Sequence, residues 1–172
     1  MPLLVPATVA GLARAHGFEN VTVLQPWQQA DIGGVTVTAA PALHGVYEIS
    51  FVLRSGADAV YFTGDTRLIP ELREIPRRLG HISIALLPTN GLRLRFAGDR
   101  QVVMDADEAA ELTAALGPEL AIPHHYRFTS GWLGDRIVTG SDPDPVHYQQ
   151  AAKEVAPDTT VRIVEPGVRV EL

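Results

Sequence analysis

The chain has 172 residues, of which 46% are hydrophobic and 20% charged, a composition typical of a soluble globular domain with a substantial core. Its net charge of −6, with 14 basic residues scattered among 20 acidic ones, argues against a nucleic-acid partner, because phosphate binding needs clustered Lys and Arg. No cysteine is present, so disulfides, thiolate ligands and cysteine nucleophiles are excluded, and any metal must be held by His, Asp and Glu.

The N-terminal segment is apolar but is not expected to enter a membrane. No apolar run approaches the roughly 20 residues that span a bilayer. Ala13-Arg14-Ala15 resembles a signal cleavage site, yet no basic residue precedes the apolar stretch 3–10, as a secretory signal requires. We therefore expect a helix at 7–16 and a cytoplasmic protein.

Apolar and amphipathic segments alternate along the whole chain, the pattern of a single α/β domain over residues 1–172. Turn sequences at 54–58 and 165–167 separate neighbouring apolar runs, which favours a mixed or antiparallel sheet. The expected strands are residues 21–24, 35–39, 49–54, 59–62, 82–87, 120–122, 161–164 and 168–172.

Three further helices follow. Asp105 and Glu108 have the spacing of a capping box for a helix at 105–116, ended by Gly117. Asp144 followed by Pro145 opens a helix that runs to about residue 155. A weaker helix at 68–79 is expected to be kinked or divided by Pro76. The stretches 96–103 and 128–143 are expected to be loops.

Three ionisable residues directly follow apolar strand candidates: His44, Asp65 and His125. Strand ends are held by a rigid sheet and face loop-lined surfaces, so side chains distant in sequence converge there. Two imidazoles and a carboxylate form a partial ligand shell for Zn²⁺, Mn²⁺ or Fe²⁺. Singly, His44 could equally be a turn residue, and Asp65 could cap the segment after it.

The remaining polar candidates are weaker. Asn90 lies at a fourth strand end, where it could contact substrate or orient a ligand, although a turn role before Gly91 is the alternative. The side chains of His124 and His125 are expected to diverge, so that at most one faces the site. Solvent-exposed roles are expected for the other three histidines, His16, His81 and His147.

Several enzyme classes lack their sequence signatures here. The chain has no G-x-S-x-G, P-loop, G-x-G-x-x-G or H-E-x-x-H motif. Serine hydrolase, nucleotide hydrolase, Rossmann dehydrogenase and zincin hypotheses are therefore unsupported.

Three motifs, in order, resemble the metallo-β-lactamase superfamily, in the branch that includes ascorbate-6-phosphate lactonase and many bacterial metal-dependent hydrolases. The segment 41–45 (PALHG) is similar to the family's third-histidine segment, 61–66 (YFTGDT) to its bridging-aspartate segment, and 122–126 (IPHHY) to its final-histidine segment. Stretches 86–91 and 104–110 resemble further parts of the same branch, so the similarity covers nearly the whole chain.

The resemblance implies an αββα sandwich with one or two metal ions at the strand ends. It implies that His44 binds the first metal, that His125, not His124, binds the second, and that Asp65 bridges them. Asn90 and Tyr126 become candidates for substrate contacts. Metals in such sites lower the pKa of a bound water and so supply a hydroxide nucleophile.

One family motif, the H-x-H-x-D-H cluster that normally precedes these segments, has no counterpart in the sequence. Each ion would then keep two protein ligands, fewer than the three or more usual for Zn²⁺. We therefore expect part of a sandwich without its N-terminal portion, with an apolar sheet face covered by a second copy or a partner chain.

Three hypotheses follow: a metal-dependent hydrolase acting on a small molecule, a catalytically inactive relative that serves as an oligomeric binding or scaffold protein, and a metal-free protein that binds an organic ligand at the strand ends. The missing cluster favours the second hypothesis for the isolated chain. The superfamily acts on lactones, phosphodiesters, thioesters and β-lactams, and one sequence does not assign a substrate.

Overall fold

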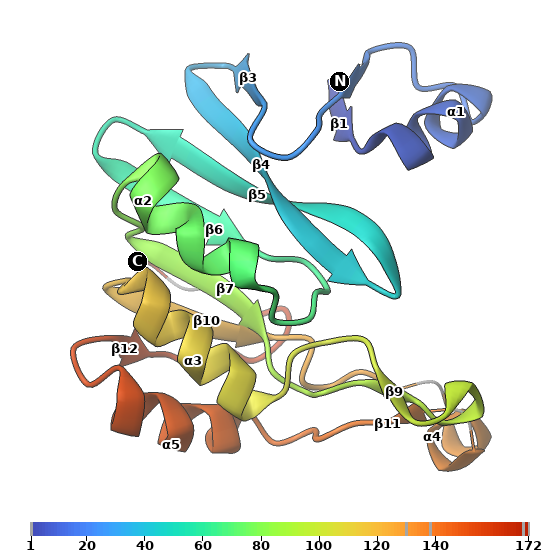
Figure 1. Cartoon of the computed structure of the whole chain (residues 1–172), viewed down its shortest axis with the longest axis vertical. Helices are drawn as coiled ribbons and strands as arrows, with labels where there is room; N and C mark the ends of the chain where they lie inside the picture. Colours follow the sequence, from blue (N-terminus) through green and yellow to red (C-terminus); the bar gives the residue numbers. More distant parts are fainter. Residues whose placement is uncertain (1, 130, 138, 170, 172) are drawn as a thin grey trace.

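A seven-stranded mixed sheet organises the molecule in the computed structural model, which describes residues 2–129, 131–137, 139–169 and 171 (Figure 1). The strand order is β12-β10-β7-β6-β5-β4-β3. β6, β7, β10 and β12 pair in parallel, whereas β3 to β6 pair antiparallel, which confirms the mixed sheet. The strands are β3 (Gln29–Ile32), β4 (Val35–His44), β5 (Val46–Ser55), β6 (Asp58–Phe62), β7 (Ile84–Pro88), β10 (Leu120–His124) and β12 (Thr160–Val161).

Helices cover one face of this sheet (Figure 1). They are the 3-10 turn η1 (Pro70–Glu74), α2 (Ile75–Leu79), α3 (Ala106–Leu116) and α5 (Pro145–Val155). The core between helices and sheet buries Leu72, Leu112 and Tyr148 completely. The hydroxyl of Tyr148 is bonded to Thr113 Oγ1 at 2.7 Å, so this buried polar group is paired.

The ends of α3 and α5 follow from their sequences. Asp105 accepts a bond from the Glu108 backbone N–H at 3.0 Å, and Glu108 accepts one in return from the Asp105 N–H at 3.2 Å. Gly117 ends α3 in the left-handed conformation. Asp144 caps α5 through the Val146 N–H at 2.9 Å. Both predicted helices are confirmed, together with the capping box.

Pro76 divides the weaker helical segment, as predicted. The segment starts at Pro70 as a 3-10 turn and becomes α-helical only from Ile75. Because Pro76 has no N–H, it cannot bond to the carbonyl of Leu72, which instead accepts the Ile75 N–H.

β4 is longer than the predicted strand at 35–39, because Pro41 does not end it. From Ala40 onward β4 pairs only with β5, since β3 pairs with β4 no further than Thr38. A proline on such an edge leaves no ladder bond unmade. The strand therefore continues to His44, which becomes its last residue.

Two small units lie outside the main sheet. β1 (Leu3–Val5) and β2 (Val21–Val23) pair in parallel around α1 (Ala7–Ala15). β8 (Arg93–Leu94), β9 (Arg100–Gln101) and β11 (Thr139–Gly140) form a second small sheet beside η2 (Arg95–Ala97) and α4 (Trp132–Ile137). Of these elements, β9, α4 and β11 lie in stretches predicted to be loops. Such two-residue pairings depend on tertiary contacts, which a local pattern does not reveal.

The predicted C-terminal hairpin is wrong. The turn forms, with the Val168 N–H bonded to the Glu165 carbonyl at 3.1 Å, but residues 168, 169 and 171 are not in a strand, and residues 170 and 172 lie outside the described part. β12 has only two residues, so it offers too short an edge for an antiparallel partner.

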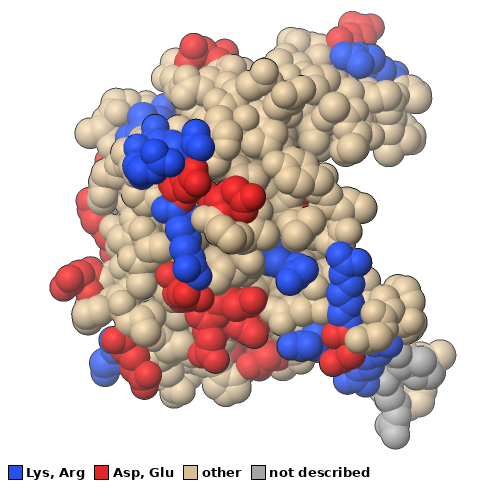
Figure 2. Space-filling model, in the orientation of Figure 1, with Lys and Arg blue, Asp and Glu red and all other residues tan. Residues whose placement is uncertain are grey.

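The second face of the main sheet carries exposed apolar side chains. Leu53 and Phe62 are 38% and 42% exposed. With Val37, Phe51, Val60 and their neighbours they line a shallow groove of about 490 Å³. On the opposite side, acidic side chains gather over α3 and α5 (Figure 2). One face of the sheet is therefore covered by helices that carry acidic side chains, whereas the groove on the other face is lined by apolar side chains. In the described part of the chain no helix is long and apolar enough to cross a bilayer.

Candidate metal centre

His44 closes β4 and is oriented by a distant part of the backbone. Its Nδ1 lies 3.0 Å from the carbonyl oxygen of Val102, a residue 58 positions away. A carbonyl only accepts, so Nδ1 carries the proton and Nε2 keeps a free lone pair. Metal-binding histidines are typically held in this way, with one ring nitrogen donating to a carbonyl while the other faces the ion.

Asp65 follows β6 after a sharp turn at Gly64, which adopts a φ of 60°. The next residue, Thr66, is fully buried, and its hydroxyl accepts the Leu43 N–H at 2.9 Å. Its carbonyl accepts the Met104 N–H at 2.8 Å. Thr66 thus joins the Asp65 turn both to the end of β4 and to the segment that holds His44.

Asp65 and His125 are in direct contact. Asp65 Oδ2 lies 3.1 Å from His125 Nε2. The Asn90 amide nitrogen, a donor, lies 3.1 Å from His125 Nδ1, so Nδ1 accepts and Nε2 carries the proton that faces Asp65. Phe128 stacks on the other side of the ring, with centroids 5.2 Å apart. These contacts fix the imidazole in position and in tautomer.

His125 also has an unusual backbone conformation, with a φ of 61°. Non-glycine residues rarely adopt this left-handed region, and such strain costs on the order of 1 kcal/mol or more where it occurs. Strained residues of this kind cluster at functional sites. The conformation turns the chain sharply after β10 and brings the ring of His125 toward Asp65.

The charge state of Asp65 favours ion binding. Burial raises the pKa of its carboxyl, but the hydrogen bond from His125 and the electrostatic effects of His125, His44 and His124 outweigh burial and leave the pKa below its usual value. Asp65 is therefore a carboxylate at neutral pH, the form that a metal ion requires.

His124 lies in a different environment from its neighbour. Its ring stacks on Phe62 at 5.2 Å, and its Nε2 lies 3.3 Å from Thr63 Oγ1. Burial lowers its pKa to about 4, so the ring is neutral at physiological pH. The two adjacent side chains therefore diverge, as predicted, and His125 alone contacts Asp65.

Asn90 and Tyr126 are both buried and both bonded. Asn90 is fully buried and orients His125, and its side-chain oxygen Oδ1 accepts the Leu92 N–H at 3.3 Å. Tyr126 is 4% exposed, and its hydroxyl donates to the Val164 carbonyl at 2.7 Å. This bond anchors the C-terminal segment to the end of β10, and a substrate contact for Tyr126 stays a prediction.

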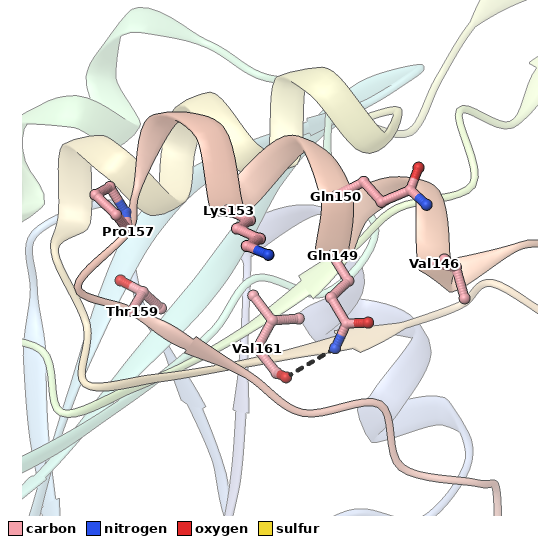
Figure 3. Close-up of a pocket in the computed structure, with 7 residues that line it drawn as sticks. All are labelled: Val146, Gln149, Gln150, Lys153, Pro157, Thr159 and Val161. Carbon is pink, nitrogen blue, oxygen red and sulfur yellow. Dashed lines mark hydrogen bonds between the residues drawn. The ribbon is translucent and has the colours of Figure 1, made fainter.

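The three other histidines lie at exposed positions outside this group. His16 bonds to the carbonyl of its own helix at Leu12, His81 pairs with Glu119, and His147 pairs with Asp142. A groove of about 520 Å³ adjoins the group, because His125 and Tyr126 line it. Another groove lies apart from it. The groove of about 430 Å³ along α5 and β12 has Lys153 as the one ionisable residue among its described lining residues. Its Gln149 amide donates to the Val161 carbonyl at 3.2 Å (Figure 3).

Sequence reasoning missed three contributors to this centre. Thr66 is part of the motif at 61–66, so its position could have been suspected. The Val102 carbonyl left no sequence signal, because any residue supplies a carbonyl. Glu48 on β5 was also overlooked; burial raises the pKa of its carboxyl, and His44 and Asp65 also act on it electrostatically.

Imidazole and carboxylate groups are the types of side chain that bind metal ions, but these side chains are spaced more widely than the ligands of a complete coordination shell. Two ligands of one tetrahedral Zn²⁺ at about 2.0 to 2.1 Å lie roughly 3.3 to 3.4 Å apart. Asp65 Oδ2 and His125 Nε2 lie 3.1 Å apart, which is close to this separation and is also an ordinary hydrogen-bond distance. Across the described residues, however, no three His, Asp or Glu side chains are placed close enough together to surround an ion.

The architecture and the strand-end residues together define a protein of the metallo-β-lactamase fold. A solved structure of Igni18, a metallo hydrolase from Ignicoccus hospitalis, superposes with a TM-score of 0.76 at 24% identity, over 98% of this chain and 67% of that one. CmlA from Streptomyces venezuelae, a diiron β-hydroxylase, superposes with a TM-score of 0.74 at 18% identity, over 95% of this chain and 38% of that one.

Sequence comparison then gives the family. Residues 2–126 match the beta-lactamase superfamily domain, and the chain belongs to this family. A protein of Deinococcus radiodurans named as a UPF0173 metal-dependent hydrolase is 28% identical over 181 residues, which span all of this chain and 70% of the relative. The resemblance read from the three motifs is therefore confirmed.

Proposed function

We propose that the chain carries the metal-binding centre of a metal-dependent hydrolase, held by His44, Asp65 and His125. The observation that carries the proposal is the orientation of His44, whose Nδ1 bonds to the Val102 carbonyl and leaves Nε2 free at the strand ends. The ionised Asp65 in contact with His125 supports it, as do relatives named as metal-dependent hydrolases.

Each residue has a defined role in this proposal. His44 presents Nε2, Asp65 presents its carboxylate, and Asn90 and Phe128 hold the ring of His125. To bind a metal through Nε2, the neutral His125 ring must carry its proton on Nδ1, which requires the Asn90 side-chain amide to turn its oxygen toward that nitrogen. Protonation of the ring at low pH would compete with the metal and weaken its binding. The bound ion, proposed to be Zn²⁺, Mn²⁺ or Fe²⁺, would polarise the scissile group and lower the pKa of a water molecule.

The test is the metal content of the purified chain after equilibration with Zn²⁺, Mn²⁺ or Fe²⁺. We expect bound metal in the wild type and loss of that metal in the His44→Ala/His125→Ala double variant. The matched control is His16→Ala/His81→Ala, which removes two exposed imidazoles outside the centre and should retain the metal. A wild type that stays metal-free would contradict the proposal, and a metal-loaded one should then be assayed on lactone, phosphodiester, thioester and β-lactam substrates.

A second candidate function is supported by the exposed sheet face. An inactive relative that serves as an oligomeric scaffold would use the groove at Leu53 and Phe62 as its interface, because exposed apolar patches of this kind mark association sites. We propose a second copy of the chain as the occupant. Light scattering of the purified protein should give twice the chain mass of 18.6 kDa, and a monomer at micromolar concentration would contradict self-association.

A further inference from the structure

The groove that adjoins the proposed metal centre lies at the end of β10. Its volume of about 520 Å³ is within the range of roughly 300 to 1,000 Å³ that small-molecule sites occupy. His125 lines this groove and also contacts Asp65, so the groove and the centre share a residue. The groove is therefore placed to hold the part of a substrate that lies beside the reacting group.

β10 supplies one wall of the groove. Ala121 packs into the helix-covered core, and side chains alternate along a strand, so Ile122 and His124 emerge on the open face of the sheet. Both line the groove. Phe128, which stacks on His125 and keeps 36% of its surface exposed, lines it as well. Aliphatic and aromatic surface is thus available directly next to the centre.

A second wall comes from the C-terminal segment 164–168. Two side chains that follow β10 hold this segment in place. The Tyr126 hydroxyl donates to the Val164 carbonyl at 2.7 Å, and Arg127 forms an ion pair with Glu165. The hydrogen bond and the ion pair thus join the second wall to the end of β10.

The charged side chains of the groove neutralise each other. Among its described lining residues, Arg127 and Glu165 are the only members of the Lys, Arg, Asp and Glu group. Nη2 of the guanidinium lies 3.0 Å from one carboxylate oxygen, and Nη1 lies 2.6 Å from the other, which is a bidentate pair. An ionic ligand group placed here would lose water without gaining an unpaired opposite charge. An apolar group would instead cover the side chains of Ile122, Val164 and Val168.

We propose that this groove binds an uncharged, apolar group of the substrate, such as an acyl chain or an aryl ring. That the ligand is a substrate rests on the proposed function, because His125 belongs to the proposed centre. Among compounds that a metal-dependent hydrolase can cleave, the groove favours lactones and thioesters with an apolar substituent over phosphodiesters, which carry a negative charge.

The test is the binding of octanamide, an uncharged amide with an apolar chain, to the metal-free protein, followed by the backbone amide signals in NMR spectra. We expect the signals of the groove, including that of Gly167, to shift. Val168→Asp places a charge in the groove and should weaken binding by about tenfold or more. The matched control is Val155→Asp on α5, outside the groove, because Val155 and Val168 are 53% and 57% exposed. The control should bind octanamide as the wild type does, and equal binding by both variants would overturn the inference.

Two further ligands test the chemistry of the groove on the wild type alone. Octanoate has a similar chain but ends in a negative charge, and acetamide has the same amide without the long chain. Both should bind more weakly than octanamide by about tenfold or more. Octanoate or acetamide bound as tightly as octanamide would overturn the inference, because charge or the amide alone would then explain binding.

Metal uptake by the same protein separates this inference from the proposed function. Zn²⁺ uptake without octanamide binding overturns this inference alone. Octanamide binding without Zn²⁺ uptake supports the apolar groove and overturns the proposed function. A wild type that binds no octanamide, and whose mass in light scattering falls on Val168→Asp, would assign the groove to a second copy of the chain and overturn the inference.

Discussion

The two faces of the seven-stranded sheet are made of similar residues but have different surroundings. On the helix-covered face Leu72, Leu112 and Tyr148 are fully buried, whereas on the other face Leu53 and Phe62 keep 38% and 42% of their surface. Apolar burial stabilises a fold roughly in proportion to the area removed from water. The covered face should therefore determine folding stability, and the open face should determine association.

The largest expected change in the free energy of unfolding comes from a substitution on the covered face. Replacing the fully buried Leu112 by Ala would leave a cavity between α3 and the sheet and should reduce the free energy of unfolding by about 2 to 5 kcal/mol. Urea denaturation measures this change. A loss below about 1 kcal/mol would show that this face is loosely packed and would remove the contrast between the faces.

The next effect is a pH dependence that comes from the open face. Burial lowers the pKa of His124 from 6.5 to about 4, so between these values the unfolded chain binds a proton that the folded chain excludes. Stability should therefore fall as the pH drops from 6.5 to 4, by on the order of 2 kcal/mol. Denaturation of the metal-free protein across this range, compared with His124→Gln, isolates the contribution. Identical slopes for both proteins would contradict a buried neutral His124.

A smaller effect is expected at the start of α3. Asp105→Ala removes the side chain that accepts the Glu108 N–H and should lower the free energy of unfolding by about 1 kcal/mol. Asp107→Ala, which removes an acidic residue of the same turn that is not the cap, is the matched control. Equal losses in the two variants would mean that helix charge, and not the cap, explains the effect.

The smallest change in folding stability belongs to the open face. Leu53→Ser should change the free energy of unfolding of the monomer by about 1 kcal/mol or less, because Leu53 is already 38% exposed. If a second copy covers this face, the same substitution should shift the protein toward monomer in light scattering. An unaltered dimer would place the interface elsewhere.

Sequence reasoning was most successful where local chemistry decides the structure. The capping box at Asp105, the proline division at Pro76 and the strand-end positions of His44 and Asp65 all follow from short-range patterns. It failed where distant contacts decide, as in the two-residue strands and the unformed C-terminal strand.

The contacts within the centre show the same difference between local patterns, which the sequence reveals, and distant contacts, which it does not. Motifs identified His44, Asp65 and His125, but the Val102 carbonyl that orients His44 lies 58 residues away, and the position of Glu48 depends on the hairpin register. Neither contact follows from residue type. The sequence therefore predicted which residues lie at the strand ends better than it predicted how they are held.

The most direct test of the metal centre is a Zn²⁺ titration of Asp65→Asn, with Asp58→Asn as the control. Asp58 is an exposed residue at the start of β6, the strand that Asp65 follows. Asparagine keeps the size of the side chain but removes the charge that attracts the ion. The account predicts that Asp65→Asn loses Zn²⁺ binding by tenfold or more while Asp58→Asn binds as the wild type does. Equal binding by both variants would contradict a metal centre at these strand ends.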